Sequence, residues 1–330
     1  MNREPLSLAV IAGLVATELA AAIGTASAAD IVKARPVYKA APPPAASGWA
    51  PCRKPAVAEP LPKFPDVPGD DIFGFTNATD VGNPGDCGLS FEYSGAAGKA
   101  DGRYGWGTLK TEFSATVADN LWVALSSFVT HHRISNVTGL DDLNRTRFDG
   151  LSGELSYRFI ERSAANRVAA TFSVEPRWAR VDGTSGAGVT AYSAEFKLFV
   201  DTVLWADRLY AALNLNYAPA TQKIDNDPLG EWFRSSSTNV SGALTYQFSD
   251  RFFFGAEARL LASFSGAGLN NNVGKALFFG PTMLVKITET AALNVVWTPQ
   301  LWGRAESSER RLDLDNFERH QFRAKLAMSF

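Results

Sequence analysis

The sequence predicts an all-β fold, a transmembrane antiparallel up-and-down β-barrel of about twelve strands. Three observations lead to this prediction. From residue 88 to the end, apolar and polar residues alternate with the period of two that a β-strand imposes on its side chains. The alternating segments have about ten or more residues, which is longer than most strands of soluble sheets. Their connections mostly alternate between short and long, as in outer-membrane barrels.

The chain begins with a predicted signal peptide over residues 1–28. Arg3 lies near its start, an apolar run follows, and small residues lead up to Ala28. Cleavage after Ala28 or Ala29 leaves a mature chain that begins with Ala29 or Asp30, so the protein is predicted to be exported. No later apolar run approaches the roughly 20 residues of a membrane helix, so a membrane would have to be crossed by strands.

Residues 29–87 are predicted to form a Pro-rich periplasmic segment, and residues 88–330 the barrel. Up to about residue 68 the segment has the composition of an extended linker that buries no core. Cys52 and Cys87 are the only cysteines of the sequence, and in an oxidising compartment they are predicted to form a disulfide. No His accompanies them at ligand spacing, so no metal site is predicted.

Residues 71–85 fit neither the linker nor a strand. They carry Phe73 and Phe75 among Gly, Asn and Asp residues. The sequence leaves two placements open for them, below the barrel or inside it.

The last strand shows the alternation best. One face carries Phe322, Ala324, Leu326, Met328 and Phe330, and the other carries Gln321, Arg323, Lys325, Ala327 and Ser329. Such a strand suits a position between lipid and an aqueous lumen. The same pattern predicts strands at residues 88–97, 104–117, 121–133, 148–160, 167–178, 189–203, 208–218, 235–248, 251–264, 275–287, 291–303 and 319–330.

The connections between these strands are of two kinds. Tight turns are predicted at 118–120, 162–166, 206–207, 249–250 and 289–290, and longer loops at 134–147, 179–188, 219–234, 265–274 and 304–318. The connection at 98–103 is short and departs from the alternation. Short turns face the periplasm in outer-membrane barrels, which predicts that both chain ends are periplasmic.

The long loops contain acidic pairs. Asp225 with Asp227, and Asp313 with Asp315, are expected to be solvated loop charges. A bridge through divalent ions to surface lipid is the alternative.

Aromatic residues concentrate near both ends of the predicted strands. They are Trp122, Trp205, Phe248 and Phe252 beside the tight turns, and Trp178, Tyr192, Tyr217, Phe264 and Trp302 toward the other ends. These positions are typical of the aromatic girdles at membrane interfaces. Because aromatics also fill soluble cores, a soluble periplasmic β-sandwich is the alternative fold. It would need a second sheet against the apolar face of nearly every long strand.

Two short stretches resemble known outer-membrane proteins. The closing strand with its terminal Phe330 resembles that of proteobacterial outer-membrane barrels, which implies that Phe330 belongs to an assembly signal. The stretch Ala29-Asp30-Ile31-Val32-Lys33, with Tyr38 and Pro42–Pro44, is similar to the mature start of alphaproteobacterial outer-membrane porin-like proteins. In part of that group a mature Ala-Asp terminus is joined to peptidoglycan, which implies Ala29 as an attachment residue. The resemblance implies outer-membrane lipid, lipopolysaccharide, the barrel assembly machinery and peptidoglycan as partners.

If every polar strand face points inward, the lumen carries seven acidic and eight basic side chains. The acidic ones are Glu92, Glu112, Glu154, Glu175, Glu195, Asp201 and Glu257, and the basic ones are Lys110, Arg158, Arg177, Lys197, Arg259, Lys286, Arg323 and Lys325. Four pairs stand two residues apart on one face: Lys110 with Glu112, Glu175 with Arg177, Glu195 with Lys197, and Glu257 with Arg259. Charges in a water-filled pore tune ion selectivity, and their near-cancellation predicts weak selectivity.

These features favour a narrow, weakly selective, porin-like diffusion channel for small solutes. Twelve strands lie between barrels that side chains fill and barrels that hold an aqueous channel. The alternative is a structural or peptidoglycan-tethering barrel whose lumen is closed by its own salt bridges. The 32 basic and 34 acidic residues give a net charge of −2, which offers no field to attract nucleic acid. No cofactor is predicted.

An outer-membrane phospholipase-like enzyme is a minor alternative. The segment His131-His132-Arg133-Ile134-Ser135-Asn136 resembles the His/Ser/Asn site of that family, in which the His lies two residues before the Ser. Here His132 precedes Ser135 by three residues and so lies on the opposite strand face. His131 shares the face of Ser135 but lies about 13 Å away at roughly 3.3 Å per residue, beyond hydrogen-bond reach. We therefore predict no enzymatic activity.

Overall fold

The computed structural model describes Cys52, Val67, Gly69 and residues 71–163, 165–205, 208–225, 228–306 and 308–330. The chain divides into two compact units, residues 1–50 and residues 51–330, and all of the described residues belong to the second. The predicted signal peptide and Ala29 lie outside the described residues.

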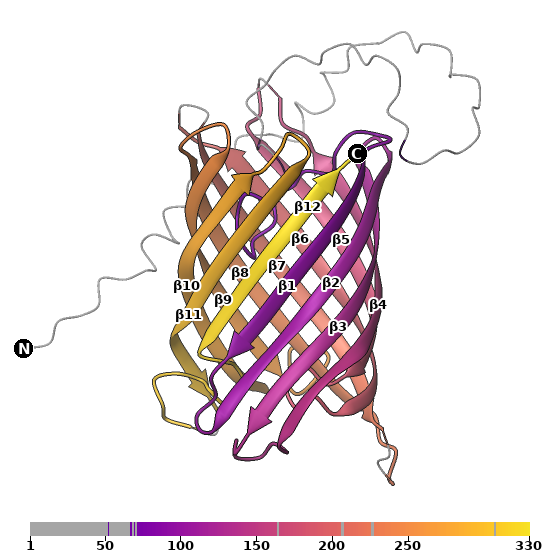
Figure 1. Cartoon of the computed structure of the whole chain (residues 1–330), viewed down its shortest axis with the longest axis vertical. Coiled ribbons are helices and arrows are strands. Elements are labelled where there is room, and N and C mark those ends of the chain that lie inside the picture. Colours follow the sequence, from indigo (N-terminus) through magenta and orange to yellow (C-terminus); the bar gives the residue numbers. More distant parts are fainter. Residues whose placement is uncertain are drawn as a thin grey trace, which may run out of the picture. The chain divides into compact units, whose positions relative to one another are not determined.

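The described residues form twelve antiparallel strands closed into one barrel, which confirms the predicted fold class (Figure 1). The strands are β1 (Cys87–Ala97), β2 (Arg103–Ala118), β3 (Leu121–Ser135), β4 (Leu143–Ile160), β5 (Val168–Val181), β6 (Gly188–Val203), β7 (Leu209–Ile224), β8 (Phe233–Gln247), β9 (Phe252–Phe264), β10 (Asn272–Lys286), β11 (Ala291–Ala305) and β12 (His320–Ser329). Each strand pairs with its neighbours in sequence, and β1 pairs with β12 to close the barrel. The closing register runs from Gly88 opposite Ser329 to Ala97 opposite His320, so no strand edge is left unpaired.

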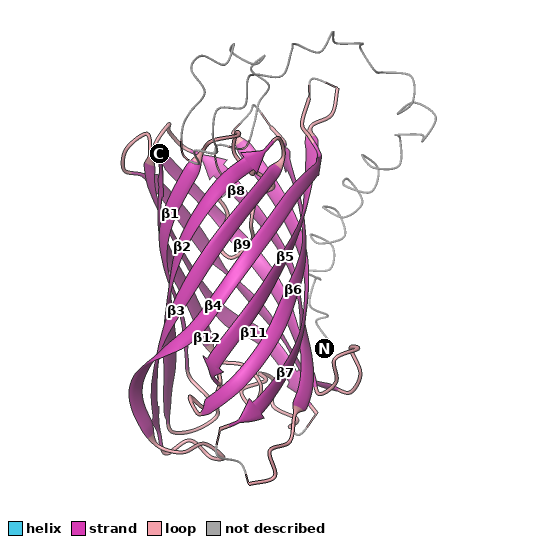
Figure 2. Cartoon of the chain, turned by 90° about the vertical axis from the view of Figure 1, so that its right-hand side faces the viewer, coloured by secondary structure: helices cyan, strands magenta, loops and turns pink. Residues whose placement is uncertain are grey.

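The strands are long and tilted around the barrel (Figure 2), and the alternation of the sequence gives each of them an outer and an inner face. On β11, Val295 and Trp297 point outward and are 36% and 48% exposed, whereas Asn294 and Thr298 point inward and are 0% exposed. Large apolar side chains are exposed on the outward faces of eleven strands and half-buried on β12, whereas polar side chains are buried inside. This is the reverse of a soluble protein.

The tight turns at 118–120, 249–250 and 289–290 lie at the barrel end that carries the C-terminus (Figure 1). Asn120 supplies a positive φ of 62° in the turn between β2 and β3, a conformation that Asn tolerates better than most residues. The backbone N–H of Phe330 donates to the carbonyl of Cys87 at 3.0 Å, which fixes the chain end beside the start of β1. We call this end of the barrel the turn end, and the opposite end the loop end.

Several strands continue further toward the loop end than their pattern predicts. β4 begins at Leu143 instead of residue 148, and β7 continues through Pro219 to Ile224 instead of ending at residue 218. The predicted boundaries were wrong because backbone pairing needs no apolar residue. Once both faces of a strand are polar, the alternation disappears while the ladder of hydrogen bonds continues.

Two side chains that we expected at the surface point inward. Trp122, predicted in an interface girdle, shares its face with the buried Ala124 and Ser126 and lines the lumen. Asp313, predicted as a solvated loop charge, is fully buried because the loop between β11 and β12 folds back onto the barrel. Its carbonyl accepts a hydrogen bond of 3.0 Å from the Gln300 side chain.

The largest apolar core lies inside the barrel at the turn end. It combines Ile72 and Phe73, which precede β1, with strand residues such as Tyr210, Phe253 and Leu284. Residues that precede the barrel in sequence therefore contribute to its interior. No helix in the described part of the chain is long and apolar enough to span a membrane.

Candidate functional site

Residues 71–82 lie inside the barrel at the turn end, and we call them the plug segment. Figure 1 shows this indigo stretch among the strands, near the C-terminus. Ile72 and Phe73 are completely buried there, as are Thr76 and Thr79. Of the two placements that the sequence left open for this stretch, the structure has the one inside the lumen.

The plug segment forms no regular structure, so its backbone groups need partners from the barrel wall. Glu257 accepts hydrogen bonds from the backbone N–H of Thr76 at 3.0 Å. Asp201 accepts from the backbone N–H of Thr79 at 2.7 Å, and Arg323 donates to the carbonyl of Gly74. Three of the charged residues predicted for the lumen thus hold the plug segment.

Uncharged side chains supply the remaining partners, and the sequence analysis did not identify them. Asn294 donates to the carbonyl of Asp71 at 2.7 Å, and Thr245 donates to that of Ile72 at 3.0 Å. Thr171 donates to the carbonyl of Thr79 at 2.7 Å. In the sequence these residues are recognisable only as polar residues at inward strand positions. Many other residues have the same property, so it does not identify the partners of the plug segment.

Ion pairs join the plug segment to the wall at its two ends. The Lys325 ammonium lies 2.8 Å from a carboxylate oxygen of Asp71, and Arg158 lies 3.5 Å from Asp80. Asp201 also pairs with Arg162 at 2.7 Å, and Arg162 donates to the Thr79 hydroxyl. These contacts explain the inward position of Arg158, which also donates to the Asn120 side chain at 3.0 Å.

Four glutamates and two lysines gather on the inner faces of β2, β4, β5 and β6, and we call this group the acidic wall. Its members are Glu112, Glu154, Glu175, Glu195, Lys110 and Lys197. Lys197 lies 2.5 Å from Glu175, 3.1 Å from Glu154 and 3.6 Å from Glu195. Lys110 lies 2.6 Å from Glu112 and 3.8 Å from Glu175. Four carboxylates thus share two ammonium groups, and the wall keeps a negative excess.

Two arginines of the lumen, on β9 and β12, lie against the plug segment. The guanidinium carbons of Arg259 and Arg323 lie 3.8 Å and 5.5 Å from the ring centre of Phe75, which belongs to the plug segment. Arg323 also lies 3.5 Å from Glu92 on β1. The plug segment therefore carries an aromatic ring between two cations, a favourable arrangement for each cation.

A cavity of about 520 Å³, the main cavity, lies between these groups. It is lined by seven acidic and six basic side chains, together with Phe75 and Asn77 of the plug segment. A second cavity of about 350 Å³ also contacts Asp71 and Asp80 and extends to the turn between β10 and β11. The plug segment thus lines a cavity toward each end of the lumen.

Two of the four predicted neighbouring pairs form ion pairs, Lys110 with Glu112 and Glu195 with Lys197. The other two do not. Arg177 pairs with Asp149 and stacks at 4.0 Å on the Phe128 ring, while Glu175 takes Lys197 and Lys110. Glu257 binds the plug segment and Arg259 stacks on it. The partners of these residues depend on contacts across strands and with the plug segment. The spacing of residues along one strand does not predict them.

Lys286, the remaining basic residue of the predicted lumen set, lies at the turn end. It lines the second cavity, and its ammonium lies 5.4 Å from the ring centre of Phe253. Lys286 is outside the group of residues that line the main cavity.

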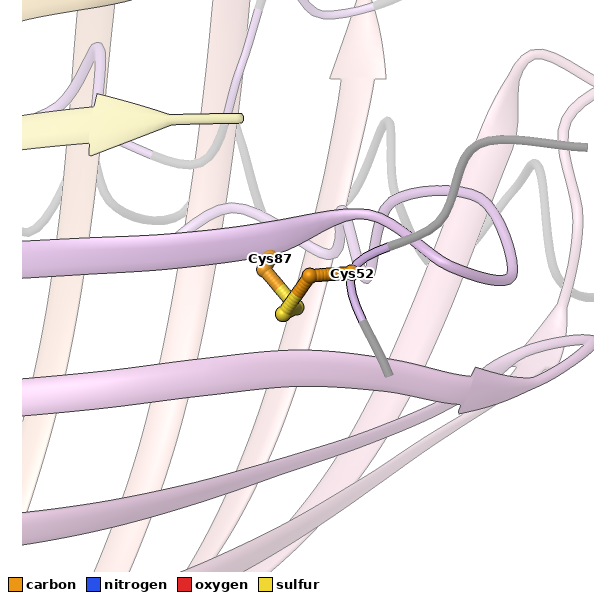
Figure 3. The surroundings of a disulfide bond; sticks show 2 residues. All are labelled: Cys52 and Cys87. Carbon is orange, nitrogen blue, oxygen red and sulfur yellow. A yellow bond between two sulfur atoms is a disulfide. The ribbon is translucent and has the colours of Figure 1, made fainter. Parts of the chain in front are cut away.

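Cys52 and Cys87 form a disulfide, with their Cα atoms 5.2 Å apart (Figure 3). Cys87 is the first residue of β1, not a linker residue as predicted. The disulfide ties Cys52 to the point at which the plug segment passes into the barrel wall. It therefore closes a loop of chain that includes the plug segment.

The histidines of the loop end contact groups other than Ser135. The Nε2 atom of His132 lies 3.0 Å from the carbonyl of Gly183, and Nδ1 of His131 lies 2.9 Å from the Thr146 hydroxyl. The Ser135 hydroxyl accepts from the Asn136 side chain at 3.1 Å. Within the described ranges, no three His, Cys, Asp or Glu side chains are grouped as a metal site.

Comparisons with known proteins give one family match and a common fold. The model of a family of unknown function, DUF6662, matches residues 65–330. No curated protein matches the sequence. A crystal structure of an outer membrane channel from Pseudomonas putida F1 shares 10% identity over 76% of this chain and 97% of that chain, with a TM-score of 0.53. The NanC porin shares 14% identity over 73% of this chain and 98% of that chain, with a TM-score of 0.44.

Proposed function

We propose that this chain, which belongs to the DUF6662 family of unknown function, is an outer-membrane channel for small solutes whose lumen the plug segment narrows. The main cavity carries this proposal. A cavity of about 520 Å³ lined by charged groups on the inside of a closed barrel suits small polar solutes. The Pseudomonas putida F1 protein that shares the fold is described as an outer membrane channel.

The outer surface supports the membrane location. Leu125, Leu155 and Phe254 are among many large apolar side chains exposed on the outward faces. Exposed apolar surface of this extent is unfavourable in water and favourable against lipid. With the short turns in the periplasm, as in other outer-membrane barrels, the turn end and the plug segment would face the periplasm.

The structural or tethering barrel is the second candidate, because the plug segment crosses the turn end of the lumen. Its many hydrogen bonds with the wall would have to break before it could leave. In the structural barrel the plug segment would be a fixed barrier, and in the channel it would be movable. The two candidates therefore predict different conductances.

A reversible cross-link distinguishes the two candidates. The Thr76 and Ser241 hydroxyl oxygens lie 3.0 Å apart, so cysteines at both positions should link the plug segment to β8. The variant combines Thr76→Cys and Ser241→Cys with Cys52→Ser and Cys87→Ser, so that only the new disulfide can form. Single-channel conductance in a planar bilayer is recorded before and after reduction, with the variant lacking Thr76→Cys as the control.

We expect a low conductance in the linked form, a higher one after reduction, and no response to reductant in the control. Equal conductance in both forms would show that solutes pass without movement of the plug segment. No conductance in any form, from barrels whose folding is verified by heat-modifiable migration in a gel, would contradict the channel and support the structural candidate.

A further inference from the structure

Arg259 is a buried cation with no acidic partner within ion-pair distance in the described part of the chain. Its side chain is 8% exposed and lines the main cavity. Its guanidinium stacks on Phe75, but the Nε and Nη1 atoms have no hydrogen-bond partner. A buried charged group with unpaired donors carries a desolvation cost that an anion would relieve.

A second buried guanidinium lies near the first. Arg323 is 6% exposed, lies against the same Phe75 ring, and has an unpaired Nε atom. Its acidic partner is Glu92 at 3.5 Å. Two like charges in one buried region repel each other, and a shared anion would reverse that effect.

The nearby acidic residue on β9 is already engaged. Glu257 stands two residues before Arg259, and its Oε2 atom accepts from the backbone and lies 3.1 Å from the hydroxyl of Thr76. Its Oε1 atom has no hydrogen-bond partner, and no ion pair joins this carboxylate to Arg259 in the described part of the chain. Arg259 and Arg323 thus line the main cavity with one carboxylate, Glu92, within ion-pair distance of Arg323.

We propose that Arg259 and Arg323, on either side of Phe75, form a binding site for the carboxylate group of a small solute. A guanidinium presents N–H groups in a planar fork that matches the two oxygens of a carboxylate. The acidic wall lines the same cavity and would repel solutes with several negative charges. The site therefore fits small monocarboxylates. This inference rests on the proposed function, because the channel brings the solute to the site.

Binding can be measured on the full mature chain in detergent, without reference to transport. Isothermal titration calorimetry at low ionic strength compares propionate with propionamide, which has nearly the same shape and no charge. We expect saturable binding of propionate and none of propionamide. Arg259→Gln should weaken propionate binding about tenfold or more, and Arg259→Lys should weaken it less, since charge is kept and the planar fork is lost.

Lys275→Gln is the matched control, because it removes the same charge from an exposed position of β10 outside the main cavity. It should leave binding unchanged. Equal binding of propionate and propionamide, or undiminished binding in Arg259→Gln, would overturn the proposal. If Arg259→Gln does not fold, Arg259→Lys takes its place, and undiminished propionate binding in that variant would overturn the proposed role of the planar guanidinium.

The conductance experiment separates this inference from the proposed function. Propionate binding by a chain without conductance would contradict the channel and support the site. Conductance by a chain that does not bind propionate would overturn the site and support the channel.

Discussion

Gly74 brings the backbone of the plug segment close to the barrel wall. It has a φ of +50°, and a Cβ atom there would lie 2.6 Å from Thr282 and 2.7 Å from the Glu257 carboxylate. Both the backbone conformation and the space favour glycine. The position of the plug segment therefore depends on the absence of one side chain.

Gly74→Val tests this dependence. The β-branched side chain cannot fit against Thr282 and Glu257, so we expect the plug segment to leave its position while the barrel still forms. Mean single-channel conductance should rise several-fold. Gly183→Val is the control, since a Cβ there meets no atom within 4 Å. Wild-type conductance in a folded Gly74→Val barrel would contradict the proposed restriction.

The contact between Asp101 and Thr138 at the loop end should depend on pH. The Thr138 side chain and backbone N–H both donate to Asp101, which lowers the pKa of that carboxyl below its usual range. Because the pKa of Asp101 is lower in the folded protein than in the unfolded chain, its ionised carboxylate stabilises the folded state fully at a pH above the unfolded-state pKa. This stabilisation is lost as the pH falls through the folded-state pKa. Carbon NMR titration should show Asp101 ionising below a reference Asp, and Thr138→Val should raise its pKa. An unchanged pKa in Thr138→Val would contradict this cause.

At the scale of elements, each strand separates two environments. On β11 the outward Val295 and Trp297 alternate with the buried Asn294 and Thr298. The burial of a strand residue thus follows from its parity, that is, from its odd or even position along the strand. A shift of the strand register by one residue would therefore expose every inward group to lipid. The tight turns fix that parity from one hairpin to the next.

Val295→Arg tests both the parity and the membrane location. An arginine on the outward face should destabilise the barrel by about 2 to 4 kcal/mol near the middle of a bilayer. The measurement is the equilibrium free energy of unfolding from lipid vesicles. Thr290→Arg places the same side chain in the exposed turn that precedes β11 and should cost much less. Equal stabilities of the two variants would contradict a lipid-facing position for Val295.

The plug segment is an element that only barrel closure creates. Its partners Thr171, Asp201, Thr245, Glu257 and Asn294 come from five different strands. The disulfide between Cys52, which precedes the plug segment, and Cys87 attaches that part of the chain to the start of β1. Covalent attachment raises the effective concentration of a displaced segment, which favours its return.

For the whole molecule, the balance of charge matters more than any single pair. The main cavity is lined by seven acidic and six basic side chains, with the acidic wall on one part and the two arginines on another. Such a distribution gives a strong transverse field and a small net charge. A channel of this kind orients polar solutes without excluding ions of either sign.

We therefore predict weak ion selectivity. In a salt gradient the reversal potential of the unlinked channel should be close to zero. Glu195→Gln should shift it toward anion preference and Lys197→Gln toward cation preference, because each changes the net charge of the cavity lining by one. A strongly selective wild-type channel, or shifts of the opposite sign, would contradict the charge assignment.

The architecture of this protein can be predicted from its amino-acid sequence alone. Alternation in β11 and β12, and abrupt turns such as that at Asn120, predicted the strand number and the fold, because both signals are local in sequence. The strand limits were less accurate where neighbouring residues on both faces are polar, as at 144–147 in β4 and 221–223 in β7.

What occupies the lumen depends on contacts between residues that are far apart in the sequence. Thr76 and Glu257 are 181 residues apart, and their hydrogen bond exists because twelve strands close around the plug segment. The same holds for Arg177, which pairs with Asp149 instead of its neighbour Glu175. Alternation reports which side of a strand a residue occupies, whereas the partner it finds there depends on distances across the barrel. Those distances are set by closure and are not encoded in any local pattern.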